Sequence, residues 1–404
     1  MDITLRPARI CGTIDIPGSK SHTIRALLIA LFANGVSTLH NALDSQDTQA
    51  CIELCRRLGA RITFKTDIPV PTLVIDSTAI ASEKEEITID CANSGTTLYL
   101  ASAMCTAGCT SKSIRFSGDE QLSKRPIEPL LESLRDLGAT IEPKDSTTIP
   151  FTIHGPLDGG RTSIECRTSQ YLSALLLACP MAQSDSTIEV PLLNEKPYVR
   201  MSQYWLEKQK IDYTCNDELS LFHIKGNQSY KPFEEHIGGD YSSATFFFCA
   251  AAMTGGTITV NGLDRSDPQG DKAVLSVLEQ MGCTVVWSGS GVTLNGPQRL
   301  KAGEFDLNDI PDALPALAVA SCFADGETKL YNVKQARLKE TDRIATMAHC
   351  INELGGSAVE LDDGLEIHPV ESFTAKEIDG CNDHRIAMSM ALASLRSAGS
   401  LTIR

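Results

Sequence analysis

Three side chains that can hold an anion stand close together near the N-terminus. Lys20, Ser21 and Arg25 follow the strand breakers Pro17 and Gly18, and an apolar run over residues 24–32 predicts that they open a helix. The N-terminus of a helix attracts anions because it presents unpaired N–H groups and the positive end of the helix dipole. The stretch therefore predicts a cradle for a phosphate or a carboxylate. A second interpretation, that the two cations solvate the start of a surface helix, stays open.

Five further turns carry similar polar residues, and each also precedes an apolar run. They lie at residues 93–96 with Arg125 after them, at 168–170 with 196–200 after them, at 240–243, at 312 with 338–343 after it, and at 382–385. Some of the hydroxyl residues, such as Ser242 and Ser243, are equally typical of plain helix caps. Asp312 and Glu340 differ, because carboxylates flanked by cations are the setting in which acid–base groups acquire a tuned pKa. The whole set suits a substrate with two or more anionic groups and a proton-transfer step.

These turns belong to a sequence repeat that occurs six times. The copies start near residues 19, 93, 168, 240, 310 and 383, so most starts are roughly 70–75 residues apart. Each copy has an apolar helix, a break and a β-branched strand, then an amphipathic helix and two further strands. Four of the amphipathic helices stop where a C-terminal cap favours positive φ, at Gly59, Gly138, Gly282 and Gly355.

The repeat predicts the fold class and the domains. Helices that are apolar on all sides belong in an interior, with the amphipathic helices and sheets around them. Six such units are too many for one core, so we expect two groups of three. The prediction is an α/β protein, a two-lobed inside-out α/β barrel of six βαβαββ units, three in each lobe. Lobe one should comprise residues 1–16 and 232–404, closed by an N-terminal strand over 3–14, and lobe two residues 17–231, with the active site in a cleft between them.

The composition excludes several classes of protein. A net charge of −15 argues against general nucleic-acid binding, which needs a basic face. The sequence shows no secretory signal and no apolar stretch of the roughly 20 residues that span a bilayer. Most of the 14 cysteines lie in apolar runs, which is typical of buried thiols in a reducing compartment. We therefore expect a cytoplasmic protein without a metal, a membrane partner or a nucleic-acid partner.

In its motifs the chain resembles the enolpyruvylshikimate phosphate synthase (3-phosphoshikimate 1-carboxyvinyltransferase) family over nearly its whole length. The matching segments, in chain order, are 17–21 with Arg25, 93–96, 125–127, 169–170, 196–198, 239–240, 310–312, 339–343 and 382–385. The resemblance implies the two-lobed fold of six units. It also implies a transferase of the shikimate pathway, which leads to chorismate and the aromatic amino acids. The enolpyruvyl group of phosphoenolpyruvate would pass to the 5-hydroxyl of shikimate 3-phosphate through a tetrahedral intermediate, with release of phosphate and without a cofactor.

The resemblance also implies three sets of site residues. Those for shikimate 3-phosphate are Lys20, Ser21, Arg25, Thr168, Ser169, Gln170, Tyr198, Asp312 and Lys339. Those for phosphoenolpyruvate are Lys20, Asn93, Gly95, Arg125, Gln170, Arg343 and Arg385. The catalytic set is Asp312 as the base for the hydroxyl, Glu340 as the acid for the methylene carbon, and Lys20, which would touch both substrates.

Three positions depart from the pattern of the family. Tyr99 stands where relatives commonly have an Arg, and relatives usually continue past the position of Arg404 with a tail whose Lys contacts phosphoenolpyruvate. Glu195 stands where relatives have a Ser before Lys-Pro-Tyr. Because a carboxylate repels a phosphate, we carry over no phosphate-binding role to Glu195.

Two alternatives come from other activities on the same fold. A UDP-N-acetylglucosamine enolpyruvyl transferase typically has Lys-Asn at the position of Lys20 and Ser21, and a reactive Cys in the loop that corresponds to residues 116–124, where this chain has none. A non-catalytic anion-binding protein would be better without the carboxylates Asp312 and Glu340. The motifs favour the shikimate 3-phosphate enzyme, acting as a monomer.

Overall fold

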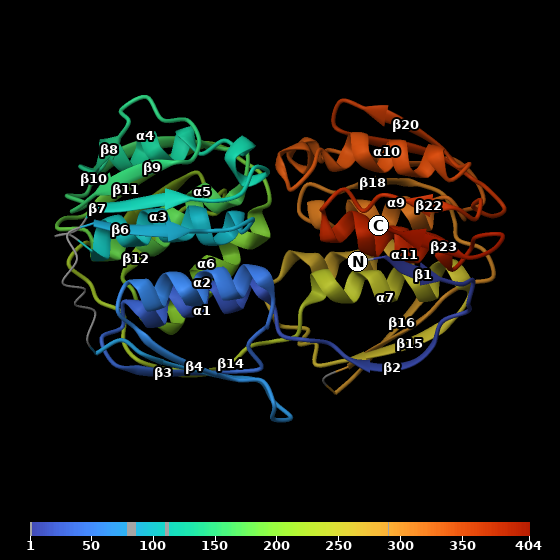
Figure 1. Cartoon of the computed structure of the whole chain (residues 1–404), viewed down its shortest axis with the longest axis horizontal. Helices are drawn as coiled ribbons and strands as arrows, with labels where there is room; N and C mark the ends of the chain where they lie inside the picture. Colours follow the sequence, from blue (N-terminus) through green and yellow to red (C-terminus); the bar gives the residue numbers. More distant parts are fainter. Residues whose placement is uncertain (1, 79–85, 110–112, 290) are drawn as a thin grey trace. The chain divides into compact units, whose positions relative to one another are not determined.

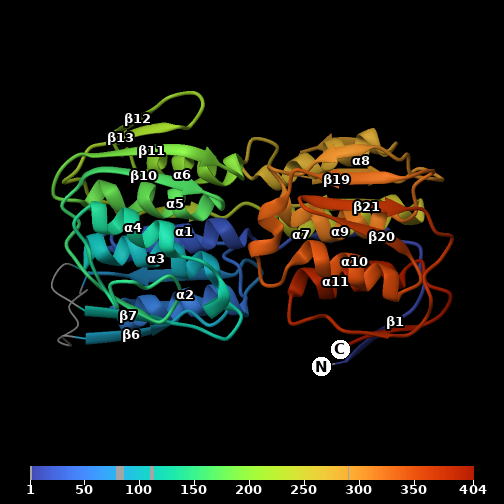
Figure 2. The same ribbon diagram turned by 90° about the horizontal axis from the view of Figure 1, so that it is seen from above.

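The chain divides into two compact units. The computed structural model describes residues 2–78, 86–109, 113–289 and 291–404. Unit 1 comprises Met1–Pro17 and Gly239–Arg404, and unit 2 comprises Gly18–Gly238. Figure 1 shows the elements of both units, and Figure 2 shows them from above.

Unit 2 holds three repeats, each with one sheet. The first has α1 (Lys20–Leu31), β3 (Val36–His40), α2 (Gln46–Arg57), β4 (Arg61–Lys65), β5 (Thr72–Asp76) and, later in the chain, β14 (Glu234–His236). The second has β6 (Glu86–Asp90), α3 (Gly95–Gly108), β7 (Ser113–Ser117), α4 (Glu128–Asp136), β8 (Thr140–Glu142) and β9 (Phe151–His154). The third has β10 (Gly160–Cys166), α5 (Ser169–Ala178), β11 (Ser186–Leu193), α6 (Lys196–Lys208), β12 (Tyr213–Cys215) and β13 (Leu221–Ile224). The sheet orders are β14-β3-β5-β4, β6-β7-β9-β8 and β10-β11-β13-β12, and in each the first pair is parallel and the others antiparallel.

Unit 1 follows the same plan in its first two repeats, whereas the described residues of its last repeat form a shorter βαβ unit that the first strand of the chain completes. Its first repeat has β2 (Cys11–Asp15), α7 (Tyr241–Thr254), β15 (Thr257–Asn261), α8 (Val274–Gln280), β16 (Thr284–Ser288) and β17 (Gly291–Asn295). The next has β18 (Glu304–Asp306), α9 (Leu314–Ser321), β19 (Thr328–Tyr331), α10 (Arg343–Glu353), β20 (Ser357–Leu361) and β21 (Gly364–His368). The last has β22 (Glu377–Ile378), α11 (His384–Ser394), β23 (Leu401–Ile403) and, from the start of the chain, β1 (Ile3–Leu5). The sheet orders are β16-β17-β15-β2, β18-β19-β21-β20 and β1-β23-β22.

The structure confirms the prediction that the apolar helices lie in the interior and the amphipathic helices lie around them. Nearly every residue of α1, α3 and α5 is buried, and α3 contacts both α1 and α5. In unit 1, α7, α9 and α11 contact one another in the same way. Each amphipathic helix, such as α2, buries only one face. The chain thus forms six α/β repeats, three in each unit. In each repeat the apolar helix starts at one of the polar motifs of the sequence.

The boundaries of the units differ from those expected near residues 16 and 231. They fall at Pro17/Gly18 and at Gly238/Gly239, because β14 pairs in parallel with β3 and so belongs to unit 2. The N-terminal strand expected over 3–14 is also two strands. β1 pairs with β23 and β2 pairs with β15, so the first residues of the chain complete two different sheets of unit 1.

Four of the amphipathic helices end at the glycines predicted from the sequence, and a fifth ends at a residue that is not glycine. Gly59, Gly138, Gly282 and Gly355 all have positive φ, as predicted. After α6 the equivalent residue is Lys210, which has φ +56° and an exposed side chain. A residue with a Cβ is strained in this left-handed region.

Replacing Lys210 with Gly should therefore stabilise unit 2 by about 0.5–1 kcal/mol. The measurement is the urea midpoint of unfolding in a Trp287→Phe background, followed by the fluorescence of Trp205, which lies on the same helix. Gly59→Ala, at φ +105° in the same unit, is the reverse control and should destabilise. An unchanged midpoint for Lys210→Gly would show that the left-handed lysine carries no strain.

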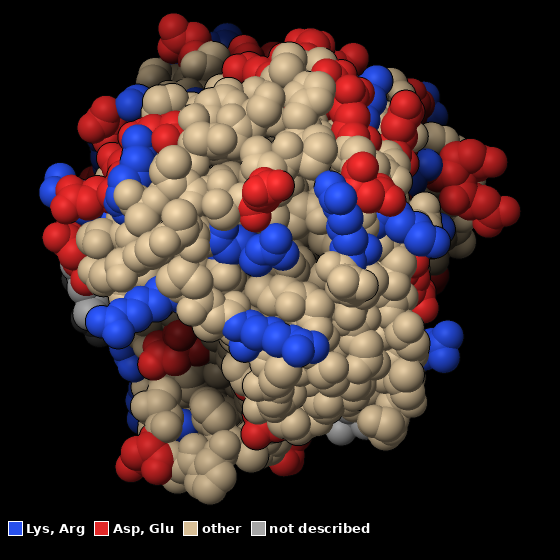
Figure 3. Space-filling view, turned by 90° about the vertical axis from the view of Figure 1, so that its right-hand side faces the viewer, with Lys and Arg blue, Asp and Glu red and all other residues tan. Residues whose placement is uncertain are grey.

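The surface charges and the cysteines can be compared with what the composition predicts about membrane, nucleic-acid and disulfide-bonded proteins. No helix among the described residues is both long enough and apolar enough to span a membrane. On the face drawn in Figure 3, the described Lys and Arg side chains are scattered among acidic and uncharged ones rather than joined into one basic area. The cysteines are free thiols, and most of them are buried, as the sequence predicts.

Candidate active site

Five of the predicted site residues come together in unit 1, at the starts of its helices. Asp312 lies in the short 3-10 helix Pro311–Ala313 that leads into α9. Lys339 and Glu340 follow the 3-10 helix Lys334–Leu338, and Arg343 is the first residue of α10. Arg385 lies in the first turn of α11. The repeat therefore brings these residues, distant in sequence, to one place because each lies at or just before the start of a helix of the same unit.

Arg343 is the centre of this cluster. Its Nη1 donates to Asp312 Oδ1 at 2.8 Å, and its Nη2 donates to Glu340. Its Nε donates to Asp383 Oδ2 at 2.9 Å, and the guanidinium is only 1% exposed. Asp312 receives two further cations, with Arg385 Nη2 at 3.0 Å from Oδ2 and Lys339 Nζ at 3.9 Å from Oδ1. Both predicted acid–base carboxylates thus contact the same guanidinium.

The electrostatics of the cluster follow from burial and from these pairs. Burial alone would raise the pKa of Asp312, but the charges of Arg385, Lys339 and Arg343 outweigh it and hold that pKa well below its usual range. Burial would likewise lower the pKa of Arg343, yet its carboxylate partners, Glu340 first, raise it above the ordinary value. Asp312 and Arg343 are therefore both charged at neutral pH.

Asp383 is a member of the cluster that the sequence motif contains but that we did not predict as a site residue. Burial would raise its pKa, but Arg343 lowers it. Its carboxylate also caps α11 by accepting from the backbone N–H of Arg385 at 2.9 Å, and it accepts from the hydroxyl of Thr341 at 3.1 Å. Its place as the N-cap of an apolar helix, between an Asn and two basic residues, was the available signal.

In unit 2, Lys20 and Arg25 have different surroundings. Lys20, the first residue of α1, pairs with Asp47 Oδ2 at 2.7 Å, and both side chains are about one-fifth exposed. Arg25 lies one turn further on and is 1% exposed. It donates to the hydroxyls of Ser202 and Ser173 and to the carbonyls of Ser21 and Tyr198. Burial lowers the pKa of Arg25 to about 10. Arg25 thus ties α1 to α5 and α6, whatever it contributes to a ligand.

The start of α3 forms a second group in unit 2. Arg125 Nη2 donates to Asn93 Oδ1 at 3.0 Å, and Asn93 Nδ2 donates to Gln121 at 2.6 Å. Gly95, the first residue of α3, leaves room for the guanidinium, since a Cβ there would lie 2.6 Å from Arg125 Nη1. The nearby Tyr99 is buried, and its hydroxyl donates to the carbonyl of Pro126. Tyr99 therefore serves the core rather than replacing an Arg.

The start of α5 forms a third group. The hydroxyls of Thr168 and Ser169 and the backbone N–H of Ser169 all donate to Glu195, and Gln170 Nε2 lies 3.4 Å from the Thr168 hydroxyl. Tyr198, on α6, is half-buried, and its carbonyl accepts from Arg25. The contact of Glu195 with the predicted phosphate-binding residues was not foreseen, because the sequence gives no sign of where that side chain points.

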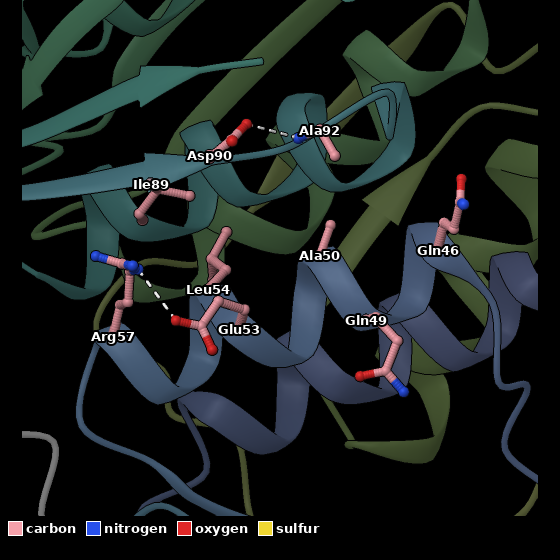
Figure 4. Close-up of a pocket in the computed structure, with 9 residues that line it drawn as sticks. All are labelled: Gln46, Gln49, Ala50, Glu53, Leu54, Arg57, Ile89, Asp90 and Ala92. Carbon is pink, nitrogen blue, oxygen red and sulfur yellow. Dashed lines mark hydrogen bonds and ion pairs between the residues drawn. The ribbon is translucent and has the colours of Figure 1, made fainter. Parts of the chain in front are cut away.

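Two other features lie away from the predicted residues. A cavity of about 440 Å³ in unit 2 lies between α2 and the end of β6, lined by Gln46, Gln49, Ala50, Glu53, Leu54, Arg57, Ile89, Asp90 and Ala92 (Figure 4). Its Arg57 and Glu53 pair with each other on the same helix. Among the described residues, three on or beside strands of unit 1 bring possible metal-ligand atoms within 4.8 Å of one another, Glu327, Glu366 and His368. None of these residues is in the predicted site.

Comparisons with known proteins show the family to which the chain belongs. A family model described as EPSP synthase (3-phosphoshikimate 1-carboxyvinyltransferase) matches residues 5–404. The 3-phosphoshikimate 1-carboxyvinyltransferase of Acetivibrio thermocellus is 43% identical over 406 residues, covering 100% of this chain and 93% of its own length. That of Ruminiclostridium cellulolyticum is 42% identical over 404 residues, covering 100% and 94%. A solved EPSP synthase from Acinetobacter baumannii has a TM-score of 0.80 at 26% identity, covering 100% of this chain and 94% of that one. The chain belongs to the EPSP synthase (3-phosphoshikimate 1-carboxyvinyltransferase) family.

Proposed function

We propose that this chain divides its reaction between the acid–base cluster of unit 1 and the anion-binding helix starts of unit 2. The reaction of the family transfers the enolpyruvyl group of phosphoenolpyruvate to shikimate 3-phosphate and releases phosphate, a step of the shikimate pathway. The observation that carries our assignment of roles is that Asp312 and Glu340 share Arg343. A site that only bound anions would gain nothing from two carboxylates there.

Asp312 is the proposed acceptor of the proton of the 5-hydroxyl, with Lys339 beside it. With its pKa held down by three cations, Asp312 is a weak base as the structure stands. Phosphoenolpyruvate carries a carboxylate and a phosphate, and we assign both to Arg343 and Arg385. Its negative charge would weaken the field that these cations exert on Asp312. Substrate binding would thus make the carboxylate a better base at the moment when it is needed.

Glu340 is the proposed acid for the methylene carbon. When phosphoenolpyruvate takes the guanidinium of Arg343, Glu340 loses its cation and can carry a proton. The hydroxyl oxygen then bonds to C2 while C3 takes the proton of Glu340, which gives the tetrahedral adduct. In the second half, C3 returns the proton to Glu340 as the bond from C2 to the phosphate oxygen breaks. Fixed cations stabilise the departing phosphate because they are already oriented before the charge develops.

The helix starts of unit 2 are the proposed anchors of the substrates. Lys20 and Arg125, the latter held by Asn93 beside Gly95, would add positive charge for phosphoenolpyruvate. The residues proposed to hold shikimate 3-phosphate are Lys20, Ser21, Arg25, Thr168, Ser169, Gln170 and Tyr198. The donors at the start of α5 suit a phosphate, since two hydroxyls and a backbone N–H point to one place.

The test is phosphate release from phosphoenolpyruvate by the purified full chain. We expect release with shikimate 3-phosphate and none with UDP-N-acetylglucosamine as the acceptor. Release with the second acceptor alone would overturn the assignment, and release with neither would favour a protein that only binds anions. Light scattering of the same sample tests our expectation of a monomer, and cell fractionation tests the expected cytoplasmic location.

A further inference from the structure

A carboxylate already occupies the anion-binding start of α5. Glu195 Oε2 accepts from the hydroxyl of Ser169 at 2.8 Å, from the backbone N–H of Ser169 at 3.1 Å and from the hydroxyl of Thr168 at 3.1 Å. All three residues are buried, with Glu195 and Ser169 each 1% exposed. Three donors that converge on one oxygen at a helix N-terminus form the surroundings that a phosphate oxygen prefers.

The backbone conformation of Glu195 directs its side chain toward the neighbouring helix α5. Glu195 directly precedes α6, yet its side chain does not cap that helix. Its φ of +57° and ψ of 42° are left-handed, a conformation that costs free energy for a residue with a Cβ. The carbonyl of Glu195 accepts from the N–H of Tyr198 in the first turn of α6. A strained residue directly before α6 therefore places its carboxylate at the start of α5.

The carboxylate and a substrate phosphate cannot both use these donors. The N–H and the hydroxyl hydrogen of Ser169 are both directed at Glu195, so a phosphate would have to take them from it. Two anions at one buried point also repel each other strongly. Either the carboxylate leaves when phosphate binds, or these residues bind no phosphate.

We propose that Glu195 is an internal anion that any phosphate-bearing ligand must displace from the start of α5, so that it weakens the binding of phosphate groups there. This inference rests on the proposed role of Thr168 and Ser169 in binding the phosphate of shikimate 3-phosphate. A free phosphate ion can bind only through these donors, which already donate hydrogen bonds to Glu195. Shikimate 3-phosphate brings the contacts of its ring and carboxylate as well, which can offset the displacement. The same displacement cost therefore keeps inorganic phosphate, which has no other contacts, out of the site, while shikimate 3-phosphate still binds.

The test replaces Glu195 with Ser and measures two ligands on the full chain. By calorimetry, shikimate 3-phosphate should bind the Glu195→Ser variant with a dissociation constant about tenfold or more below that of the unaltered chain. Inorganic phosphate should become a competitive inhibitor toward shikimate 3-phosphate, its inhibition constant falling by about the same factor or more. Glu195→Gln, which removes the charge but keeps an acceptor, should give a smaller gain of the same sign. Glu189→Ser is the matched control, because Glu189 is half-exposed on β11 and pairs only loosely with Arg161, at 3.7 Å.

The opposite results would identify a different role. If Glu195 stays in place and orients Ser169, both variants will bind shikimate 3-phosphate more weakly, and inorganic phosphate will not inhibit more strongly; that outcome overturns the proposal. Thermal unfolding with and without inorganic phosphate separates this from misfolding, since a folded Glu195→Ser variant should be stabilised by phosphate more than the unaltered chain. Turnover by the unaltered chain is measured separately, because it tests the proposed function rather than the role of Glu195. Its absence would contradict the proposed function, whereas turnover without a gain on Glu195→Ser would contradict this inference alone.

Discussion

Replacing Glu340 with Gln should lower kcat by about 10²- to 10⁴-fold, the range that a positioned general acid contributes. The amide keeps the size of the side chain and can still accept from Arg343, but it cannot give a proton to C3 of phosphoenolpyruvate. The KM for both substrates should therefore change little. The measurement is steady-state phosphate release, together with deuterium incorporation at C3 from heavy water, which should fall by the same factor as kcat.

A matched substitution separates acid catalysis from loss of charge. Glu360→Gln makes the same change in unit 1 at a residue that is 45% exposed and pairs with Arg337. It should leave kcat and deuterium incorporation unaltered. If Glu340→Gln turned over normally, another group would have to protonate the carbon. If kcat fell but deuterium incorporation persisted, Glu340 would act on a later step.

The second large effect is on stability. Asp383→Asn should destabilise unit 1 by about 3 kcal/mol, because an amide NH₂ would face the N–H donors of Arg343 or Arg385 and the buried cluster would hold more cations than carboxylates. Arg343 would keep Asp312 and Glu340 but lose the charge of Asp383 and one of the two hydrogen bonds that its Nε and Nη2 donate to that carboxylate. The helix start of α11 would also lose a charged cap.

The two tryptophans make unit 1 measurable by itself. Trp205 lies on α6 of unit 2 and Trp287 on β16 of unit 1. In a Trp205→Phe background, urea unfolding followed by fluorescence reports unit 1 alone. Asp362→Asn is the control, since that carboxylate is 82% exposed and pairs with Lys334 at the surface, where ion pairs contribute little to stability. Equal midpoints for the two variants would contradict the role of Asp383.

The same carboxylate gives a prediction for pH. Arg343 holds the pKa of Asp383 below its ordinary value, so its contribution to stability is present above the unfolded pKa of about 3.9. The contribution is lost as the pH falls through the folded pKa. Unit 1 of the unaltered chain should therefore lose stability steeply below about pH 4, and Asp383→Asn should flatten that part of the curve.

Much of the fold could be predicted from the sequence because its signals are local. Apolar helices of small residues, glycine stops such as Gly59 and a repeat of fixed length each report on a few neighbouring residues. The pairing of β14 with β3 could not be predicted, since nearly 200 residues separate Glu234 from Thr38 and three residues carry little pattern. The division of residues 3–14 into two strands of different sheets was missed for the same reason.

Sequence reasoning predicted which residues of unit 1 would lie together, but it did not predict their contacts. Asp312, Lys339, Glu340, Arg343 and Arg385 lie together, as motifs at successive helix starts suggested. Which partner each side chain takes depends on rotamers and on distances across repeats. The sequence therefore could not reveal that Glu195 reaches Ser169 or that Asp383 holds Arg343.

The long sequence separation between β1 and β2 and their partner strands in unit 1 has a consequence for synthesis on the ribosome. Unit 2 has all its strands once residue 236 has been made, so it can fold while the rest of the chain is still being translated. β2 must wait for β15, and β1 must wait for β23 at residues 401–403. An unpaired nascent strand invites aggregation. Both waiting strands are short, and most of their residues remain exposed even after folding, which limits how well they can recruit a wrong partner.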